Sequence, residues 1–244
     1  MRQVFALRKM LLIFGFALAV FGCDMNKDQL SNANNKVLAA QYVFSTNREL
    51  LAKIEYGHDS KGNMTKVSNY DENGELSGYS ELERDPKGNT TKASHYRTNG
   101  DFYITEIEYD SEGNETKANH YINSNVELAS YIEYEYDSNG NQTKWREYTA
   151  SGELLDYGEY EYDSTGNLTK WNHYNADGEL LWRVVWEYDS NGNLMKCSQY
   201  NANGELSGYA EYESKSNGTR TKQSDYDANG ELYSYTVYLY LGLK

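Results

Sequence analysis

Apolar or aromatic residues alternate with polar residues in short runs that fill the chain from residue 37 to its end. The runs EYEY at residues 159–162 and LTKWNHY at residues 168–174 are typical, and both contain residue types that strands favour. Clusters of Asp, Asn, Ser and Gly separate the runs, as in DSTGN at residues 163–167 and NADGE at residues 175–179. Such clusters are typical of tight hairpin turns. The pattern therefore predicts an all-β chain built from antiparallel hairpins.

The hairpins repeat every 25 to 27 residues, and most steps are 26 residues, as the glycine of the first turn shows. This glycine occurs at Gly62, Gly88, Gly113, Gly140, Gly166, Gly192 and Gly218. In every unit a lysine follows four residues later and a tyrosine eight residues later. A second turn, usually close to NGEL, completes a unit of two strands. Its glycine is replaced by Val126 in one unit and by Arg48 in a degenerate unit at the start.

A meander of about fourteen such strands cannot stay flat, because the twist between strands accumulates. We expect it to curl into a ribbon, spiral or partial tube whose aromatic face is concave. A three-residue loop in DSTGN would place Tyr160 on this face with Lys170 and Tyr174. Glu161 and Trp171 would then lie on the opposite face. The degenerate first unit and the apolar last strand, residues 233–244, are expected to cap the array over residues 37–244.

With the phrases EYEYDSNGN at residues 133–141 and EYEYDSTGNLTK at residues 159–170, the array resembles the YD-repeat (Rhs-type) family. The resemblance implies β-hairpin repeats on secreted or surface-attached bacterial proteins. Larger members build β shells around toxins, and some are implicated in carbohydrate binding or cell contact. The unit here is longer, its NGEL turn is unusually regular, and the chain stops with the repeats, so a toxin-delivery role is poorly supported.

The first 22 residues are typical of a lipoprotein signal peptide. Three basic residues precede an apolar run over residues 10–21, which is too short to cross ~30 Å of hydrocarbon. The run ends in VFGC, which resembles the bacterial lipobox, although an ordinary secretory signal with an incidental cysteine is the alternative. In the lipobox interpretation Cys23 carries the lipid and residues 23–36 form a flexible tether. The protein is then anchored to a membrane of the bacterial cell envelope, outside the cytoplasm.

Charge and cysteine content narrow the partners further. The 244 residues include 25 tyrosines and carry a formal charge of −14, which disfavours nucleic acid and anionic lipid surfaces as partners. Cys23 and Cys197 are the two cysteines, so lipidation of Cys23 would leave no disulfide within the chain. The repeat position of Cys197 holds Val67, Ala93 or Trp171 in other units, which is typical of a packing site.

The sequence predicts no enzyme, no metal site and no cofactor. Turns such as DSNGN place glycine fourth, whereas an EF-hand loop places it sixth and adds a bidentate glutamate. His95, His120 and His173 share a repeat position that Asn69 and Asp225 fill in other units. We therefore expect this position to be polar and solvent-facing, with no role as a ligand or base. Paired glutamates recur in nearly every unit, whereas a catalytic pair should be singular.

The lysine and tyrosine rows form the candidate ligand site, a stripe on the concave face made of Lys144, Tyr148, Lys170, Tyr174, Lys196 and Tyr200. Packing of lysine stems on rings and ion pairs across strands would explain these rows structurally. The functional alternative is a ladder that reads a repeating polymer, because weak contacts sum by avidity. The function that follows is an envelope-anchored, non-catalytic binding or adhesion module for a cell-wall or surface glycan. The alternative is a structural or immunity-like envelope lipoprotein that contacts one surface or envelope protein.

Overall fold

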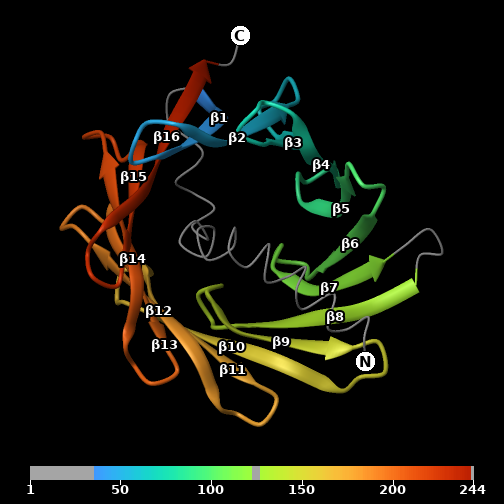
Figure 1. Ribbon diagram of the computed structural model, residues 1–244. Coiled ribbons are helices and arrows are strands. Elements are labelled where there is room, and N and C mark those ends of the chain that lie inside the picture. The colour runs from blue at the N-terminus through green and yellow to red at the C-terminus, as the bar shows by residue number, and fades with distance from the viewer. Residues whose placement is uncertain (1–35, 123–126, 243–244) are drawn as a thin grey trace.

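The computed structural model describes residues 36–122 and 127–242, which form sixteen antiparallel strands. Each strand pairs with its neighbours in the sequence, and β1 pairs with β16, so the sheet closes into a barrel (Figure 1). The strands are β1 Lys36–Ser45, β2 Leu50–His58, β3 Met64–Tyr70, β4 Leu76–Arg84, β5 Thr90–Arg97, β6 Phe102–Tyr109, β7 Glu115–Ile122, β8 Glu127–Tyr136, β9 Gln142–Thr149, β10 Leu154–Tyr162, β11 Leu168–Asn175, β12 Leu180–Tyr188, β13 Leu194–Asn201, β14 Leu206–Ser214, β15 Arg220–Asp227 and β16 Leu232–Gly242.

The all-β expectation is correct, but the expected ribbon, spiral or partial tube is wrong, because the barrel is closed. The strands that carry the degenerate start and the apolar end of the array pair with each other, from Lys36 opposite Gly242 to Ser45 opposite Ser234. Every described strand pair except β5–β6 contains a register shift. A bulge adds local twist and bends the strand, and closure needs a stagger that accumulates around the sheet. Closure also leaves no exposed sheet edge.

The turns are as the sequence predicts, with a type I turn followed by a glycine of positive φ. In DSTGN the amide of Asp163 donates to the carbonyl of Asn167 (2.9 Å), and Gly166 has a φ of 87°. The Asp163 carboxylate accepts bonds from the amides of Thr165 and Asn167. In the degenerate unit Arg48 occupies the glycine position with a φ of 66°. The corresponding turn at Val126 lies outside the described residues.

In four units one contact joins the unit to the unit before it. The tyrosine that precedes the DSxGN turn donates to a backbone carbonyl 19 or 20 residues earlier, as Tyr109 does to Thr90, Tyr162 to Gln142 and Tyr188 to Leu168, at 2.7–2.9 Å. In one unit Arg84 takes the position of the tyrosine and still donates to the carbonyl of Met64. These carbonyls lie where the strand begins, next to the bulge. The tyrosine hydroxyl therefore satisfies an acceptor at the point where the ladder is interrupted.

The expected grouping of side chains into faces is wrong by one residue. Tyr162 lies opposite Leu168 as predicted, but Thr169 is an extra residue in a bulge, so Lys170 lies opposite Glu161. A shift of one residue exchanges the faces of a strand. Lys170 therefore shares a face with the glutamates, and Trp171 lies opposite Tyr160.

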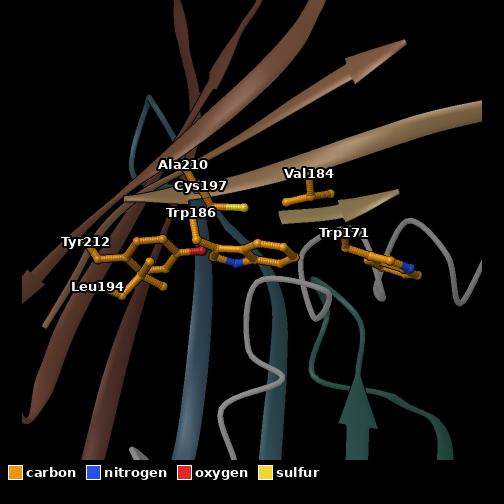
Figure 2. Packing of buried hydrophobic residues seen from close by; sticks show 7 residues of the cluster. All are labelled: Trp171, Val184, Trp186, Leu194, Cys197, Ala210 and Tyr212. Atoms are coloured by element: carbon orange, nitrogen blue, oxygen red, sulfur yellow. The ribbon is translucent and has the colours of Figure 1, made fainter. Parts of the chain in front are cut away.

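The barrel interior holds the main apolar cluster, which consists of Trp171, Val184, Trp186, Leu194, Cys197, Ala210 and Tyr212 (Figure 2). Trp186 is 4% exposed and Cys197 3% exposed. Trp145 and Trp171 both fold over Gly158, where an added Cβ would clash with their indole nitrogens. The lysine of each unit and the glutamates opposite it lie on the other face, which points outward. The expectation of an inward row carrying the lysines is therefore wrong.

The histidine position is also not solvent-facing as expected, because it lies on the same inward face as the apolar cluster. His95 lies opposite Ser80, and its Nδ1 is 2.7 Å from the serine hydroxyl. His120 lies opposite Thr105, with Nδ1 3.0 Å from that hydroxyl. Burial lowers the pKa of both histidines from 6.5 to about 4. In three units the polar residue at this position faces a hydroxyl inside the barrel, as His95, His120 and Asp225 do.

Exchange of the residues at the two kinds of turn should change stability in opposite directions. Arg48→Gly should raise the free energy of unfolding by roughly 0.5–1 kcal/mol. Glycine removes the strain of the left-handed backbone at this position, and this gain exceeds the entropy that glycine loses on folding. Gly166→Arg should lower the free energy of unfolding by about 1–2 kcal/mol for the reverse reason. Urea unfolding of each variant measures both effects. A change of the same sign in both variants would contradict the turn assignment.

The buried histidines should make the barrel less stable at acid pH. The unfolded chain binds protons more readily than the folded one between pH 6.5 and about 4, so stability falls as the pH drops through this window. The double variant His95→Asn with His120→Asn tests this, because Asn69 fills the same repeat position in another unit. Its free energy of unfolding should fall less on acidification, by about 1 kcal/mol or more per histidine replaced. Urea unfolding at pH 7.5, 6 and 5 measures the slope. Parallel curves for the variant and the unaltered chain would show that the histidines do not contribute.

Candidate functional site

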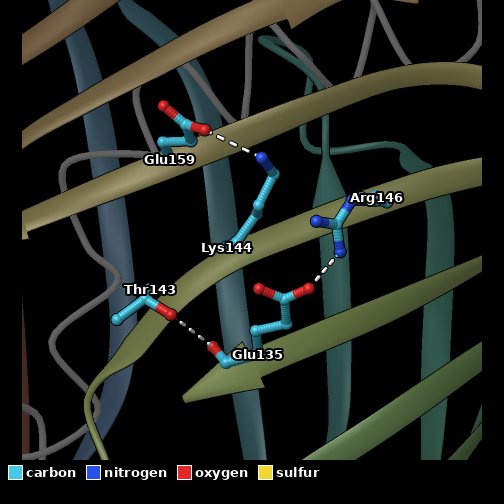
Figure 3. A network of polar contacts seen from close by, with 5 residues as sticks. All are labelled: Glu135, Thr143, Lys144, Arg146 and Glu159. Carbon is cyan, nitrogen blue, oxygen red and sulfur yellow. Dashed lines mark hydrogen bonds and ion pairs between the residues drawn. The ribbon is translucent and has the colours of Figure 1, made fainter. Parts of the chain in front are cut away.

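The predicted stripe is present as a shared face, but it lies on the outer surface of the barrel and not on the concave one. Its residues are Lys144, Tyr148, Lys170, Tyr174, Lys196 and Tyr200, on β9, β11 and β13. The Lys144 Nζ is 2.8 Å from the Glu159 carboxylate and 4.5 Å from the centre of the Tyr157 ring. Figure 3 shows this lysine and the neighbouring pair of Arg146 and Glu135 on the outer side of the strands.

The other stripe residues also have partners within the wall. The Lys170 Nζ is 2.9 Å from Glu161, and the Lys196 Nζ lies 4.0 Å from the Tyr209 ring. Tyr174 stacks on Tyr157 with ring centres 4.9 Å apart. Exposed pairs of this kind contribute roughly 0–1 kcal/mol each. Contacts between neighbouring strands therefore account for the rows, as the structural interpretation proposes.

The outer wall forms a charged belt in which lysines of the odd-numbered strands β3 to β15 face glutamates of the even-numbered strands. Lys92 lies opposite Glu83 and Glu106, and Lys196 lies opposite Glu187 and Glu211. The remaining lysines of the belt are Lys66, Lys117, Lys144, Lys170 and Lys222. Opposite charges directly across a strand pair stabilise its register.

Two grooves lie at the rim of the barrel that carries the DSxGN turns, and we refer to them as the rim grooves. The first has a volume of about 570 Å³ and is lined by Asp163, Thr165, Asn167, Thr169, Trp186, Tyr188, Asp189, Ser190, Asn191 and Gly192. The second has a volume of about 670 Å³ and is lined by Asp137, Asn139, Asn141, Thr143, Tyr160, Tyr162, Asp163, Ser164, Thr165 and Gly166. They lie on either side of one turn, so the two sites are one repeat apart.

Each rim groove combines an aromatic wall with polar turn residues. In the first groove the aromatic wall is Trp186 and Tyr188, and the hydroxyl of Tyr188 is bound to the carbonyl of Leu168. The turn's hydroxyl and amide groups bond to Asp163 and lower its pKa to about 2, so this carboxylate is ionised at neutral pH. Both of its oxygens accept bonds within the turn. Hydroxyl and amide groups on the turns therefore offer the polar contacts, and a fixed negative charge lies beside them.

The aromatic wall continues into the barrel interior as an arrangement that sequence reasoning missed. All four tryptophans of the chain lie on inward positions of β9, β11 and β12, and they are Trp145, Trp171, Trp182 and Trp186. Trp171 and Trp182 meet edge to face at 4.5 Å between ring centres. The sequence does carry a signal for this arrangement, because all its tryptophans fall within about one and a half repeats and the rest of the array contains no tryptophan.

The described residues contain no group of three or more His, Cys, Asp or Glu side chains that could hold a metal ion. None of the described residues forms a helix long and apolar enough to cross a membrane. The predicted lipid-attachment residue, Cys23, lies outside the described residues.

Two solved structures have a similar fold. A porin-like protein from Bacteroides uniformis ATCC 8492 is 10% identical, with a TM-score of 0.55, and the similarity covers 84% of this chain and 98% of that one. A porin-like protein from Bacteroides vulgatus ATCC 8482 is 12% identical, with a TM-score of 0.52 and the same coverage. No protein-family model matches the chain, and no curated protein matches it. The YD-repeat resemblance thus stays a prediction, and at these identities the structural similarity extends to the fold alone.

Proposed function

We propose that this protein is a non-catalytic glycan-binding barrel of the bacterial envelope, and that the rim grooves bind the glycan. The observation that carries the proposal is the pair of grooves one repeat apart, each with an aromatic wall and polar turn residues. A repeating site suits a repeating ligand, since weak contacts to successive units sum by avidity.

Sugar chemistry fits this combination of side chains. A pyranose ring has an apolar face that can lie against Tyr188 or Tyr162, and hydroxyls at its edge that can bond to turn amides and hydroxyls. Volumes of about 570 and 670 Å³ are within the usual range for small-molecule sites. The net charge of −14 and the ionised Asp163 favour a neutral ligand over a polyanion.

We infer that the wall faces water, although the two similar structures are called porin-like. The charged belt runs around β3 to β15 and would meet lipid if the barrel spanned a bilayer. A lysine at the midplane of a bilayer costs about 2–4 kcal/mol on a barrel surface, and the belt contains seven lysines. In this proposal, a lipid on Cys23 attaches the protein to the membrane.

Removal of the proposed anchor should release the protein. Cys23→Ser should move it from the membrane fraction to a soluble fraction, because the acylated residue is lost. Metabolic labelling with a radioactive fatty acid should label the unaltered protein and not the variant. Equal membrane retention of both proteins, with neither labelled, would contradict the anchor.

Filling the rim grooves should abolish glycan binding. We expect the mature chain to bind neutral oligosaccharides or soluble peptidoglycan fragments more tightly as they lengthen. Ser164→Trp with Ser190→Trp places one large side chain in each groove, at turn positions that tolerate most residues. Calorimetry should show a loss of affinity of at least about tenfold, or ~1.4 kcal/mol.

Two matched variants locate the effect. Ala176→Trp with Ala202→Trp makes the same change in NGEL turns at the opposite rim and should leave binding unchanged. Lys144→Gln, Lys170→Gln and Lys196→Gln together should also leave it unchanged if the outer stripe only holds the wall together. Loss of binding in this lysine variant would move the site to the stripe, and no binding to any glycan would end the proposal.

A further inference from the structure

The charged belt lacks a glutamate at single positions, Gly57 opposite Lys66 and Val185 opposite Lys170. At the strand pair that closes the barrel, the loss extends over two adjacent strands. Lys222 on β15 lies opposite Val237 rather than a glutamate, and Lys53 on β2 lies opposite Tyr42. Between these lysines the outward positions of β16 and of residues 37–44 of β1 carry no charged side chain. We call this surface the seam, and it comprises Tyr42, Phe44, Tyr235, Val237, Leu239 and Leu241.

The seam is apolar and exposed. Val237, Leu239 and Leu241 are 40%, 44% and 55% exposed, and exposure rises towards the end of β16. Phe44 and Tyr235 stack on each other with ring centres 5.4 Å apart. The inward residues of the same strand are buried, as Thr236 and Tyr238 are 4% and 7% exposed. Every strand from β2 to β15 presents a lysine, arginine or glutamate outward, so the seam differs from the rest of the wall.

The position of the seam indicates what covers it. Because hairpins alternate between the two rims, β1 begins and β16 ends at the rim of the DSxGN turns. The exposed leucines of β16 therefore lie at the end of the barrel where the chain arrives from Cys23. Lys36 follows Cys23 by thirteen positions, and this length of chain spans at most about 45 Å when extended.

A second copy of the chain fits the seam less well than a lipid surface. Stable interfaces bury about 800 Å² on each partner, whereas two convex barrels that meet along two strands touch over a narrow strip. Their acidic walls would repel each other on both sides of that strip. A bilayer surface is extended and can deform around the strip. Tyrosine with aliphatic residues is the composition found at membrane interfaces, where tyrosine places its hydroxyl among the headgroups.

We propose that the seam lies on the surface of the membrane to which Cys23 is attached. The inference rests on the lipid anchor of the proposed function, because a short tether keeps the seam at a high local concentration near the bilayer. The contact is interfacial and does not span the membrane. It places the barrel axis along the membrane plane, so that both rims, including the rim grooves, open sideways into water.

The test uses the mature chain from residue 23 with Cys23→Ser, so that the seam is measured without the anchor. In flotation with phosphatidylcholine vesicles, this protein should partition measurably into the lipid fraction. Val237→Glu with Leu239→Glu should reduce the partition coefficient at least tenfold. The control is Leu181→Glu with Met195→Glu, which changes residues of 42% and 46% exposure away from the seam and should stay within twofold.

Circular dichroism checks that each variant keeps its β structure, and sedimentation equilibrium without lipid reports association of copies. Absence of vesicle binding, or an equal loss in the seam and control variants, would overturn the proposal. A dimer that the seam substitutions dissociate would also overturn it in favour of a second copy. Failure of the anchor itself is read separately, from the absence of lipid on Cys23 in the unaltered protein.

Discussion

The pairing of β1 with β16 is the interaction on which the rest of the structure depends. It joins the two ends of the array over most of the length of both strands, from Lys36 to Ser45. Without it the two edge strands would leave their amides and carbonyls unpaired, which invites edge-to-edge association. On the other side of β16, the hydroxyl of Tyr238 donates to the Gln223 side chain of β15 at 2.9 Å. Closure also defines an inside, an outside and two rims, and each candidate surface belongs to one of these.

Closure in turn depends on a small defect repeated in nearly every hairpin. The bulge that contains Thr169 adds a residue to one strand, and the tyrosine of a neighbouring unit binds a carbonyl beside such a bulge. Each copy of the tyrosine-rich phrase thus makes a strand pair, and in the copies that contain Tyr109, Tyr162 and Tyr188 it also joins that pair to the preceding one. A repeat of this kind yields a nearly uniform wall. Positions that depart from the repeat are therefore the best indicators of function. The tryptophans behind the rim grooves and the uncharged seam are such exceptions.

The two faces of the wall have different chemistry because they have different neighbours. Outward side chains diverge on a convex surface, and lysines there lie over rings and beside glutamates, as Lys144 does with Tyr157 and Glu159. Inward side chains converge, so that Trp145 and Trp171 on alternate strands meet over Gly158 with ring centres 6.4 Å apart. Convergence also buries polar groups, which lowers the pKa of His95 and raises that of Asp225. The barrel therefore places its tryptophans inside, and its lysine–glutamate pairs with the tyrosines they lie over outside.

The sequence by itself determined the local structure of this protein. The period of the array, the strand-forming runs and the turn geometry at Gly166 and Arg48 all follow from interactions within a few residues, which the linear order of residues displays. The closed barrel, the orientation of the lysine row and the burial of the histidines were decided by the tertiary structure. The extra residue at Thr169 reverses the face of every residue after it, and its effect becomes visible only when the partner strand is in place. The rim grooves and the seam depend most on tertiary structure. The grooves depend on the distance between neighbouring turns, and the seam on the approach of the two end strands. Both distances are set by the stagger that accumulates over all sixteen strands.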